Sequence, residues 1–140
     1  MRLRSPSSLA FAIAGIVILA GCSESGPKTV PVYGTVTFVG GDEPSWCHIY
    51  FTPTKSDGGI NRPTFADRQS NGGYTAKSFS GSRGLLPGTY RVRVNWYQLK
   101  PGKDPNRESN WNEISFDAGE LVVDADSSGI KHDIEVPKKT

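Results

Sequence analysis

A regular alternation of apolar and polar side chains constrains the fold of this chain more than any other feature of the sequence. The clearest case alternates Tyr90, Val92, Val94 and Trp96 with Arg91, Arg93 and Asn95. Successive side chains of a β-strand point to opposite faces, so this pattern predicts a strand with one buried face and one solvated face. After Val30, no window carries apolar residues at the helical spacing of i, i+3, i+4 and i+7. We therefore expect an all-β domain.

Weaker alternation, bounded by glycine, proline and asparagine, predicts six further short strands. They are expected over residues 32–38, 47–51, 64–67, 73–79, 120–125 and 130–136. The inward positions of the first two strands are expected to be Val32, Gly34, Val36, Phe38, Cys47, Ile49 and Phe51. Seven short strands with dense turns favour a β-sandwich, because each sheet then covers one face of the other.

The N-terminal segment has the three zones of a bacterial signal peptide. Arg2 and Arg4 precede an apolar run from Leu9 to Leu19, and small residues follow as far as Cys22. A membrane-spanning helix needs about 20 predominantly apolar residues, and this run is shorter. The pattern therefore predicts that residues 1–21 are a signal peptide that is removed, with the mature chain beginning at Cys22.

The motif Leu19-Ala20-Gly21-Cys22 resembles the lipobox of bacterial lipoproteins. In that family the cysteine sulfur takes a diacylglyceryl group, and cleavage leaves an acylated N-terminal cysteine. The resemblance implies fatty acyl chains such as palmitate on Cys22, with the membrane as a partner. One acyl chain anchors weakly, at about 0.8 kcal/mol per buried CH₂, so several chains are needed to hold a protein stably. An ordinary cleavage site with an incidental cysteine is the alternative.

A short polar tether over residues 22–29 connects this anchor to the domain expected over residues 30–137. Six extended residues reach at most about 20 Å, so the domain is expected close to the membrane surface. Ser23 follows the lipidated cysteine, and in many diderm bacteria a residue other than Asp at this position goes with export to the outer membrane. We therefore expect a cell-envelope lipoprotein anchored in the outer membrane, facing the periplasm or the cell surface.

The charge of the mature chain argues against nucleic acid as a partner. The full sequence has 16 basic and 14 acidic side chains, and removal of Arg2 and Arg4 leaves 14 of each sign. A protein that binds phosphate backbones needs a concentration of Lys and Arg, which this balance does not provide. Cys47 is the only other cysteine besides Cys22, so an intrachain disulfide is not expected and stability must come from packing.

Several segments of the sequence carry a family resemblance: 32–38, 49–53, Gly73-Tyr74 and Gly84-Leu85-Leu86-Pro87-Gly88-Thr89-Tyr90. Together they resemble a carboxypeptidase regulatory-like domain, and the chain is similar to small lipoproteins of planctomycete-type bacteria. The family's fold is a seven-stranded, transthyretin-like (prealbumin-like) β-sandwich. Its members serve as accessory or structural modules without catalytic residues, so the resemblance implies no enzyme activity and no cofactor.

These observations predict a membrane-anchored, non-catalytic lipoprotein with a structural or interaction role, whose partner is an envelope protein or a glycan. The alternative is a carbohydrate- or peptide-binding module that uses exposed aromatic side chains. Tyr97 lies on the polar face of its strand, and Trp111 ends a polar segment over residues 97–111. A loop of this length is typically functional or mobile. Packing within the sandwich is the competing role for these aromatic residues.

An acidic cluster near the C-terminus has the spacing of a calcium-binding loop. Asp124, Asp126 and Glu135 follow the oxygen-ligand pattern of such loops, with Gly129 at the turn position. A strand pattern precedes the cluster where an EF-hand requires a helix, so we expect a turn and no metal.

Cys47 and His132 are candidates for a nucleophile and its base, or for two ligands of a soft metal. Alternation places Cys47 with Ile49 and Phe51, and His132 with Ile130 and Ile134, so both side chains are expected to face the core. A buried cysteine behaves as a small apolar residue, and packing is therefore the favoured role. An enzyme built on these two residues is the third interpretation of the chain.

Overall fold

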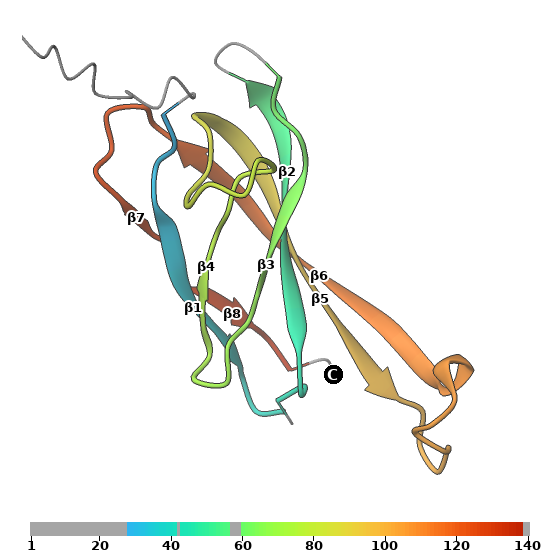
Figure 1. The fold of residues 1–140 in the computed structure, drawn as a ribbon. Coiled ribbons are helices and arrows are strands. Elements are labelled where there is room, and N and C mark those ends of the chain that lie inside the picture. The colour runs from blue at the N-terminus through green and yellow to red at the C-terminus, as the bar shows by residue number, and fades with distance from the viewer. Residues whose placement is uncertain (1–27, 42, 57–59, 139–140) are drawn as a thin grey trace, which may run out of the picture.

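The computed structural model describes residues 28–41, 43–56 and 60–138, and its regular structure is almost entirely β-strand (Figure 1). The strands are β1 (Val32–Phe38), β2 (Cys47–Ser56), β3 (Thr64–Asp67), β4 (Gly73–Thr75), β5 (Gly88–Leu99), β6 (Trp111–Val123), β7 (Ile130–Lys131) and β8 (Ile134–Val136). A single-turn 3-10 helix, η1, spans Glu108–Asn110. Within the described residues, no helix is long and apolar enough to cross a membrane. Residues 1–21, predicted to be a signal peptide, and Cys22 lie outside the described residues.

The strands form two four-stranded sheets, which confirms the all-β, two-sheet architecture. One sheet has the order β3-β2-β5-β6, and the other has β4 and the β7 and β8 segments on the two sides of β1. Both β7 and β8 pair in parallel with β1. They are separated because the Asp133 carboxylate, in place of a backbone carbonyl, accepts a hydrogen bond from Thr35 N at 2.9 Å. The expected seven strands are therefore eight, with the last one interrupted.

The core lies between the sheets, and the predicted register of the central strands is confirmed. Ile49, Phe51, Val92 and Val94 are fully buried, as are Val32, Val36, Cys47 and Tyr90. Trp96 and Phe38 are partly buried and pack against the core, with ring centroids 5.1 Å apart in an edge-to-face contact. Burial of an apolar side chain of this size stabilises a fold by about 1.5–3 kcal/mol, so these strands dominate the stability of the domain.

The C-terminal ends of β2 and β4 differ from the prediction. β2 continues past Pro53 to Ser56, and its register shifts between Pro53 and Lys55. A bulge of this kind accommodates a residue that has no N–H for the ladder. β4 ends at Thr75, well short of residue 79, because Ser78 N donates to Ser82 O at 2.8 Å and the chain turns back.

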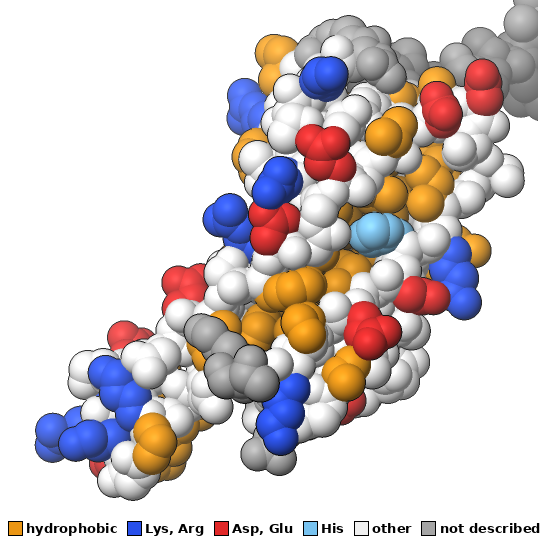
Figure 2. Space-filling model, turned by 180° about the vertical axis from the view of Figure 1, so that it is seen from behind, with side chains coloured by type: hydrophobic (Ala, Val, Ile, Leu, Met, Phe, Trp, Pro, Cys, Tyr) orange, Lys and Arg blue, Asp and Glu red, His pale blue; other side chains and the backbone are white. Residues whose placement is uncertain are grey.

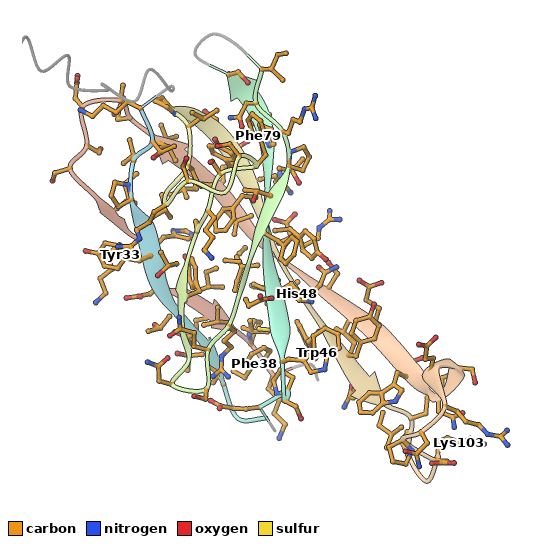
Figure 3. The ribbon with its side chains drawn as sticks, in the orientation of Figure 1. Tyr33, Phe38, Trp46, His48, Phe79 and Lys103 are labelled. Atoms are coloured by element: carbon orange, nitrogen blue, oxygen red, sulfur yellow. The ribbon has the colours of Figure 1, made fainter. Side chains whose placement is uncertain are left out.

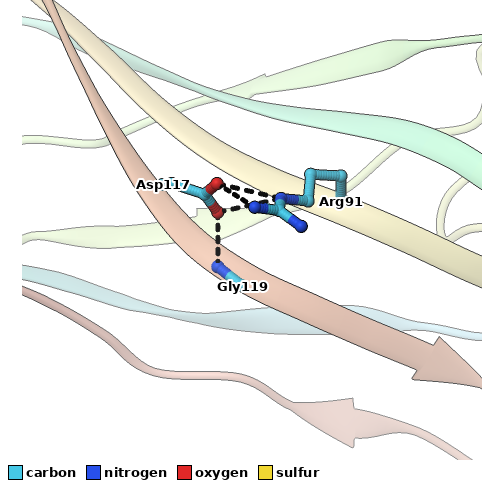
Figure 4. Close-up of polar contacts among 3 residues, drawn as sticks. All are labelled: Arg91, Asp117 and Gly119. Carbon is cyan, nitrogen blue, oxygen red and sulfur yellow. Dashed lines mark hydrogen bonds and ion pairs between the residues drawn. The ribbon is translucent and has the colours of Figure 1, made fainter.

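The largest difference concerns β6, which begins at Trp111 and not at residue 120. A β-bulge interrupts its alternation: Asp117 faces Arg93, and Gly119 faces Val92, with Ala118 as the extra residue between them. Gly119 adopts a φ of 86°, which favours glycine. The Asp117 carboxylate accepts hydrogen bonds from Gly119 N at 2.9 Å and from Arg91 Nε, and these hydrogen bonds stabilise the bulge (Figure 4). The bulge allows Phe116 and Leu121 to face the core although they are five positions apart.

The ends of β5 and β6 extend beyond the other strands as a projecting hairpin (Figure 1). The expected loop over 97–111 therefore shortens to residues 100–110, because Leu99 still pairs with Trp111. Hydrogen bonds close this loop: Lys100 N donates to Asn110 O at 2.8 Å, and Asn110 Nδ2 donates to Asp104 O at 2.9 Å. The hairpin tip lies at the opposite end of the domain from the start of β1.

Candidate functional site

An exposed aromatic cleft lies on the outer face of the sheet that contains β2 and β5. The alternation that sends Ile49 and Val94 inward sends His48, Tyr50 and Tyr97 outward. Cys47 pairs with Trp96, so Trp46, directly before β2, comes to lie beside Tyr97. Strand pairing thus assembles the cleft from segments that are about fifty positions apart in the sequence.

The cleft has a volume of about 450 Å³ and is lined by Trp46, Tyr97, Glu108 and Trp111. The ring centroids of Trp46 and Tyr97 are 5.0 Å apart, and the ring planes are inclined by 37°. Trp46 is 48% exposed and Tyr97 is 37% exposed, which is unusual for aromatic side chains of this size. The structure therefore brings the two aromatic candidates from the sequence, Tyr97 and Trp111, into one cleft and adds Trp46.

Trp111 is fixed in place by the hairpin loop. Its indole Nε1–H donates to Pro105 O at 2.9 Å, and the neighbouring Asn110 amide is bonded to Asp104 O. The ring is half-buried, and its N–H is already satisfied by the protein. The loop therefore holds the Trp111 ring as a preformed wall of the cleft.

Glu108 contributes the one acidic side chain of the cleft lining. It is the first residue of η1, is exposed, and has no ion-pair partner among the residues that the structure describes. Nearby Lys100 uses its Nζ to donate to Ser109 O at 2.7 Å. The other basic residues of the loop, Lys103 and Arg107, are exposed at the hairpin tip, where basic side chains gather at the lower left of Figure 2.

Aromatic rings continue from the cleft across the outer face of β2 and β3. His48 lies next to Trp46 with ring centroids 5.1 Å apart, as Figure 3 shows, and Phe65 follows at 5.2 Å from His48. Tyr50 lies 5.7 Å from Phe65. The His48 ring is oriented by Asp67, whose carboxylate lies 2.6 Å from Nδ1. The cleft is therefore one end of a larger aromatic surface.

Sequence reasoning missed Trp46 and Glu108 as members of the cleft. Trp46 precedes its strand, and only the pairing of β2 with β5 shows that it reaches Tyr97. Glu108 lies inside the polar loop, where one acidic residue among many charged ones carries no signal. The local clue to Trp46 is that it alternates with His48 and Tyr50, which places three rings on one face of a strand.

A larger groove of about 950 Å³ lies on the inner side of the hairpin. Trp96, Ile114 and Phe116 line it from the hairpin, and Phe38 and Val136 line it from the other sheet. The second sheet ends before the hairpin does, so the side chains from the hairpin remain partly exposed, whereas Val136 is buried.

Cys47 and His132 lie on different sheets. Cys47 is 1% exposed on β2, and burial raises the pKa of its thiol to about 11. His132 is half-buried between β7 and β8, and burial lowers the pKa of its imidazole. Its Nε2 is buried without a hydrogen-bond partner in the described part of the chain. This geometry favours a packing role for both residues.

The acidic candidates near the C-terminus are distributed over two elements. Asp124 and Asp126 lie in the turn after β6, where Ser127 N donates to Asp124 O at 3.1 Å, and Glu135 is on β8 opposite Thr37. Among residues 28–41, 43–56 and 60–138, no group of three or more His, Cys, Asp or Glu side chains is placed to hold a metal ion.

The chain matches no family model, no curated protein and no solved structure.

Proposed function

We propose that this protein is a membrane-anchored, non-catalytic lipoprotein of the cell envelope, held by acyl chains on Cys22 and sorted to the outer membrane. The support is the lipobox at the end of the signal-peptide pattern and the few residues of sequence between Cys22 and the backbone bridge at Val30. Replacement of Cys22 by Ala is expected to abolish incorporation of labelled palmitate and to release the protein from membranes or block its processing. Unchanged labelling and unchanged detergent partitioning would refute the anchor.

The proposed fold family is the transthyretin-like, carboxypeptidase regulatory-like group. Two packed sheets support it, as does the single interrupted strand that β7 and β8 form along β1. The Pro87-Gly88 turn also leads directly into β5, as the family motif requires. Membership in this group favours an accessory role and assigns no catalytic residue.

The interaction site of this lipoprotein is the cleft of Trp46, Tyr97, Trp111 and Glu108, which serves a carbohydrate or a peptide. The single observation that supports this assignment is the gathering of three exposed or half-buried rings around a carboxylate at the hairpin. Aromatic rings supply large contact areas at low entropic cost, and they are enriched where proteins bind ligands. The hairpin lies at the far end of the domain from the start of β1 (Figure 1), and β1 follows the proposed tether in the sequence. We infer that the cleft is presented away from the anchoring membrane.

The test is a titration of the purified full-length protein with envelope oligosaccharides and, separately, with envelope-derived peptides, followed by tryptophan fluorescence. One of these ligand classes is expected to bind, and Trp46→Ala is expected to weaken binding at least tenfold. Val122→Ala is the matched control, because Val122 is an exposed apolar residue on β6 outside the cleft. Equal binding by wild type and Trp46→Ala would refute the assignment of the site.

A further inference from the structure

The walls of the cleft suit a compact ligand better than a flat one. The Trp46 and Tyr97 rings contact each other, with centroids 5.0 Å apart and planes inclined by 37°, so together they form one bent aromatic surface, and Trp111 also lines the cleft. A sugar ring stacks best on a single flat aromatic face, whereas a rounded group contacts several inclined faces at once. The arrangement therefore favours a ligand group of nearly spherical shape.

The electrostatics of the lining favour a positive charge. Three aromatic side chains line the cleft, and the face of an aromatic ring attracts cations. Glu108 adds a carboxylate that has no ion-pair partner among the described residues. No basic side chain lines the cleft. The nearest basic group of the loop, Lys100 Nζ, is bonded to Ser109 O.

The hydrogen-bonding groups of the lining are few. Trp111 Nε1–H is bonded to Pro105 O, so this ring offers a face and no donor. A primary ammonium has three N–H donors that each need an acceptor, and Glu108 is the single carboxylate in the lining. An ammonium whose hydrogens are replaced by methyl groups has no donor to satisfy and brings its charge against the rings.

The geometry points to a quaternary ammonium group of the choline type as the ligand of the Trp46–Tyr97–Trp111–Glu108 cleft. This inference rests on the proposed function, since it assumes that the cleft is the interaction site. It names the chemical group recognised there, which a substituted carbohydrate or a methylated peptide of the envelope would carry. The ring faces contact the methyl groups, and Glu108 provides the opposing charge.

The experiment compares choline with its uncharged isostere, 3,3-dimethylbutan-1-ol, on the full-length protein in a polyoxyethylene detergent, which carries neither sugar nor choline. Binding is followed by tryptophan fluorescence and by calorimetry. Choline is expected to bind at least about tenfold more tightly than the isostere, as cation–π attraction in a partly desolvated site predicts. Glu108→Gln is expected to weaken choline binding severalfold and to leave binding of the isostere unchanged. Glu135→Gln, a carboxylate on β8 outside the cleft, is the charge control and is expected to bind choline normally.

The outcomes separate this inference from the proposed function. Equal affinity for choline and the isostere, or unchanged choline binding by Glu108→Gln, overturns the inference. If choline does not bind while a neutral oligosaccharide or an unmodified peptide does, and Trp46→Ala abolishes that binding, the inference fails and the proposed function stands. If neither choline nor any oligosaccharide or peptide binds in a Trp46-dependent manner, both fail.

Discussion

The thiol of Cys47 provides a quantitative test of the register of β2. The side chain is 1% exposed, and burial raises its pKa from 9.0 to about 11. Two pKa units correspond to about 100-fold less thiolate at neutral pH, and the thiolate is the form that alkylating reagents attack. Since the reagent must also reach a buried atom, native Cys47 is expected to react with iodoacetamide at least about 100-fold more slowly than the unfolded chain.

The assay uses a chain that begins after Cys22, in which Cys47 is the only cysteine, and follows alkylation by mass spectrometry at pH 7.5 with and without urea. Cys47→Ser is expected to lower the free energy of unfolding by about 1–3 kcal/mol, because the hydroxyl enters an apolar core without a partner. Cys47→Ala controls for the loss of sulfur. A native alkylation rate within tenfold of the unfolded rate, together with a fully stable Cys47→Ser variant, would refute the buried register and favour an enzyme.

Three further predictions concern the contact between β1 and the β7–β8 strand. Tyr74→Phe removes the hydrogen bond from the buried Tyr74 hydroxyl to His132 O at 2.5 Å, and is expected to cost about 1–3 kcal/mol in urea unfolding. Tyr33→Phe is the control, and because Tyr33 is exposed this change is expected to leave the free energy of unfolding unchanged. Equal losses of stability in the two variants would contradict a stabilising role for the hydrogen bond of Tyr74. Gly34→Ala would place a Cβ 2.0 Å from His132 O and is expected to detach the β7–β8 strand from β1. Gly41→Ala is the control, because a Cβ at that position meets no other atom. Hydrogen exchange measures the detachment, and unchanged amide protection of residues 130–136 in Gly34→Ala would disprove it. Burial lowers the folded-state pKa of His132 below 6.5, so the unfolded state takes up the proton first and the stability of the fold decreases as the pH drops below 6.5. Thermal melts between pH 7.5 and 5.5 are expected to show a weaker dependence of stability on pH in His132→Gln than in the wild type. The same pH dependence in both proteins would exclude His132 as its source.

Local alternation was sufficient to predict the centre of the sandwich. The inward faces of β2 and β5 follow directly from their apolar positions, and Ile49, Phe51, Val92 and Val94 are buried as expected. These are the central strands of their sheet, with one face buried in the core and the other exposed to solvent. The alternation of apolar and polar residues in the sequence follows from that difference.

The first half of β6 could not be recognised from the same pattern. The bulge at Ala118 and Gly119 adds one residue between Phe116 and Leu121, so inward-facing residues are at even positions before the bulge and at odd positions after it. No single alternation therefore runs through the strand. The cleft was hidden for a different reason: Trp46, Tyr97 and Glu108 meet through the pairing of β2 with β5 and through the hairpin loop. Strand pairing is a property of the folded chain, and one sequence does not encode it in a local pattern.

The parallel pairing of β1 with β7 and β8 has a consequence for the order in which the domain can form. β1 is the first strand of the described chain, and it must wait for Ile130–Lys131 and Ile134–Val136 before its second edge is covered. Contacts between segments so distant in sequence require closure of a long loop, which slows folding. A chain that begins to fold while it is synthesised from its N-terminus therefore cannot complete the sandwich until its C-terminal strand has followed.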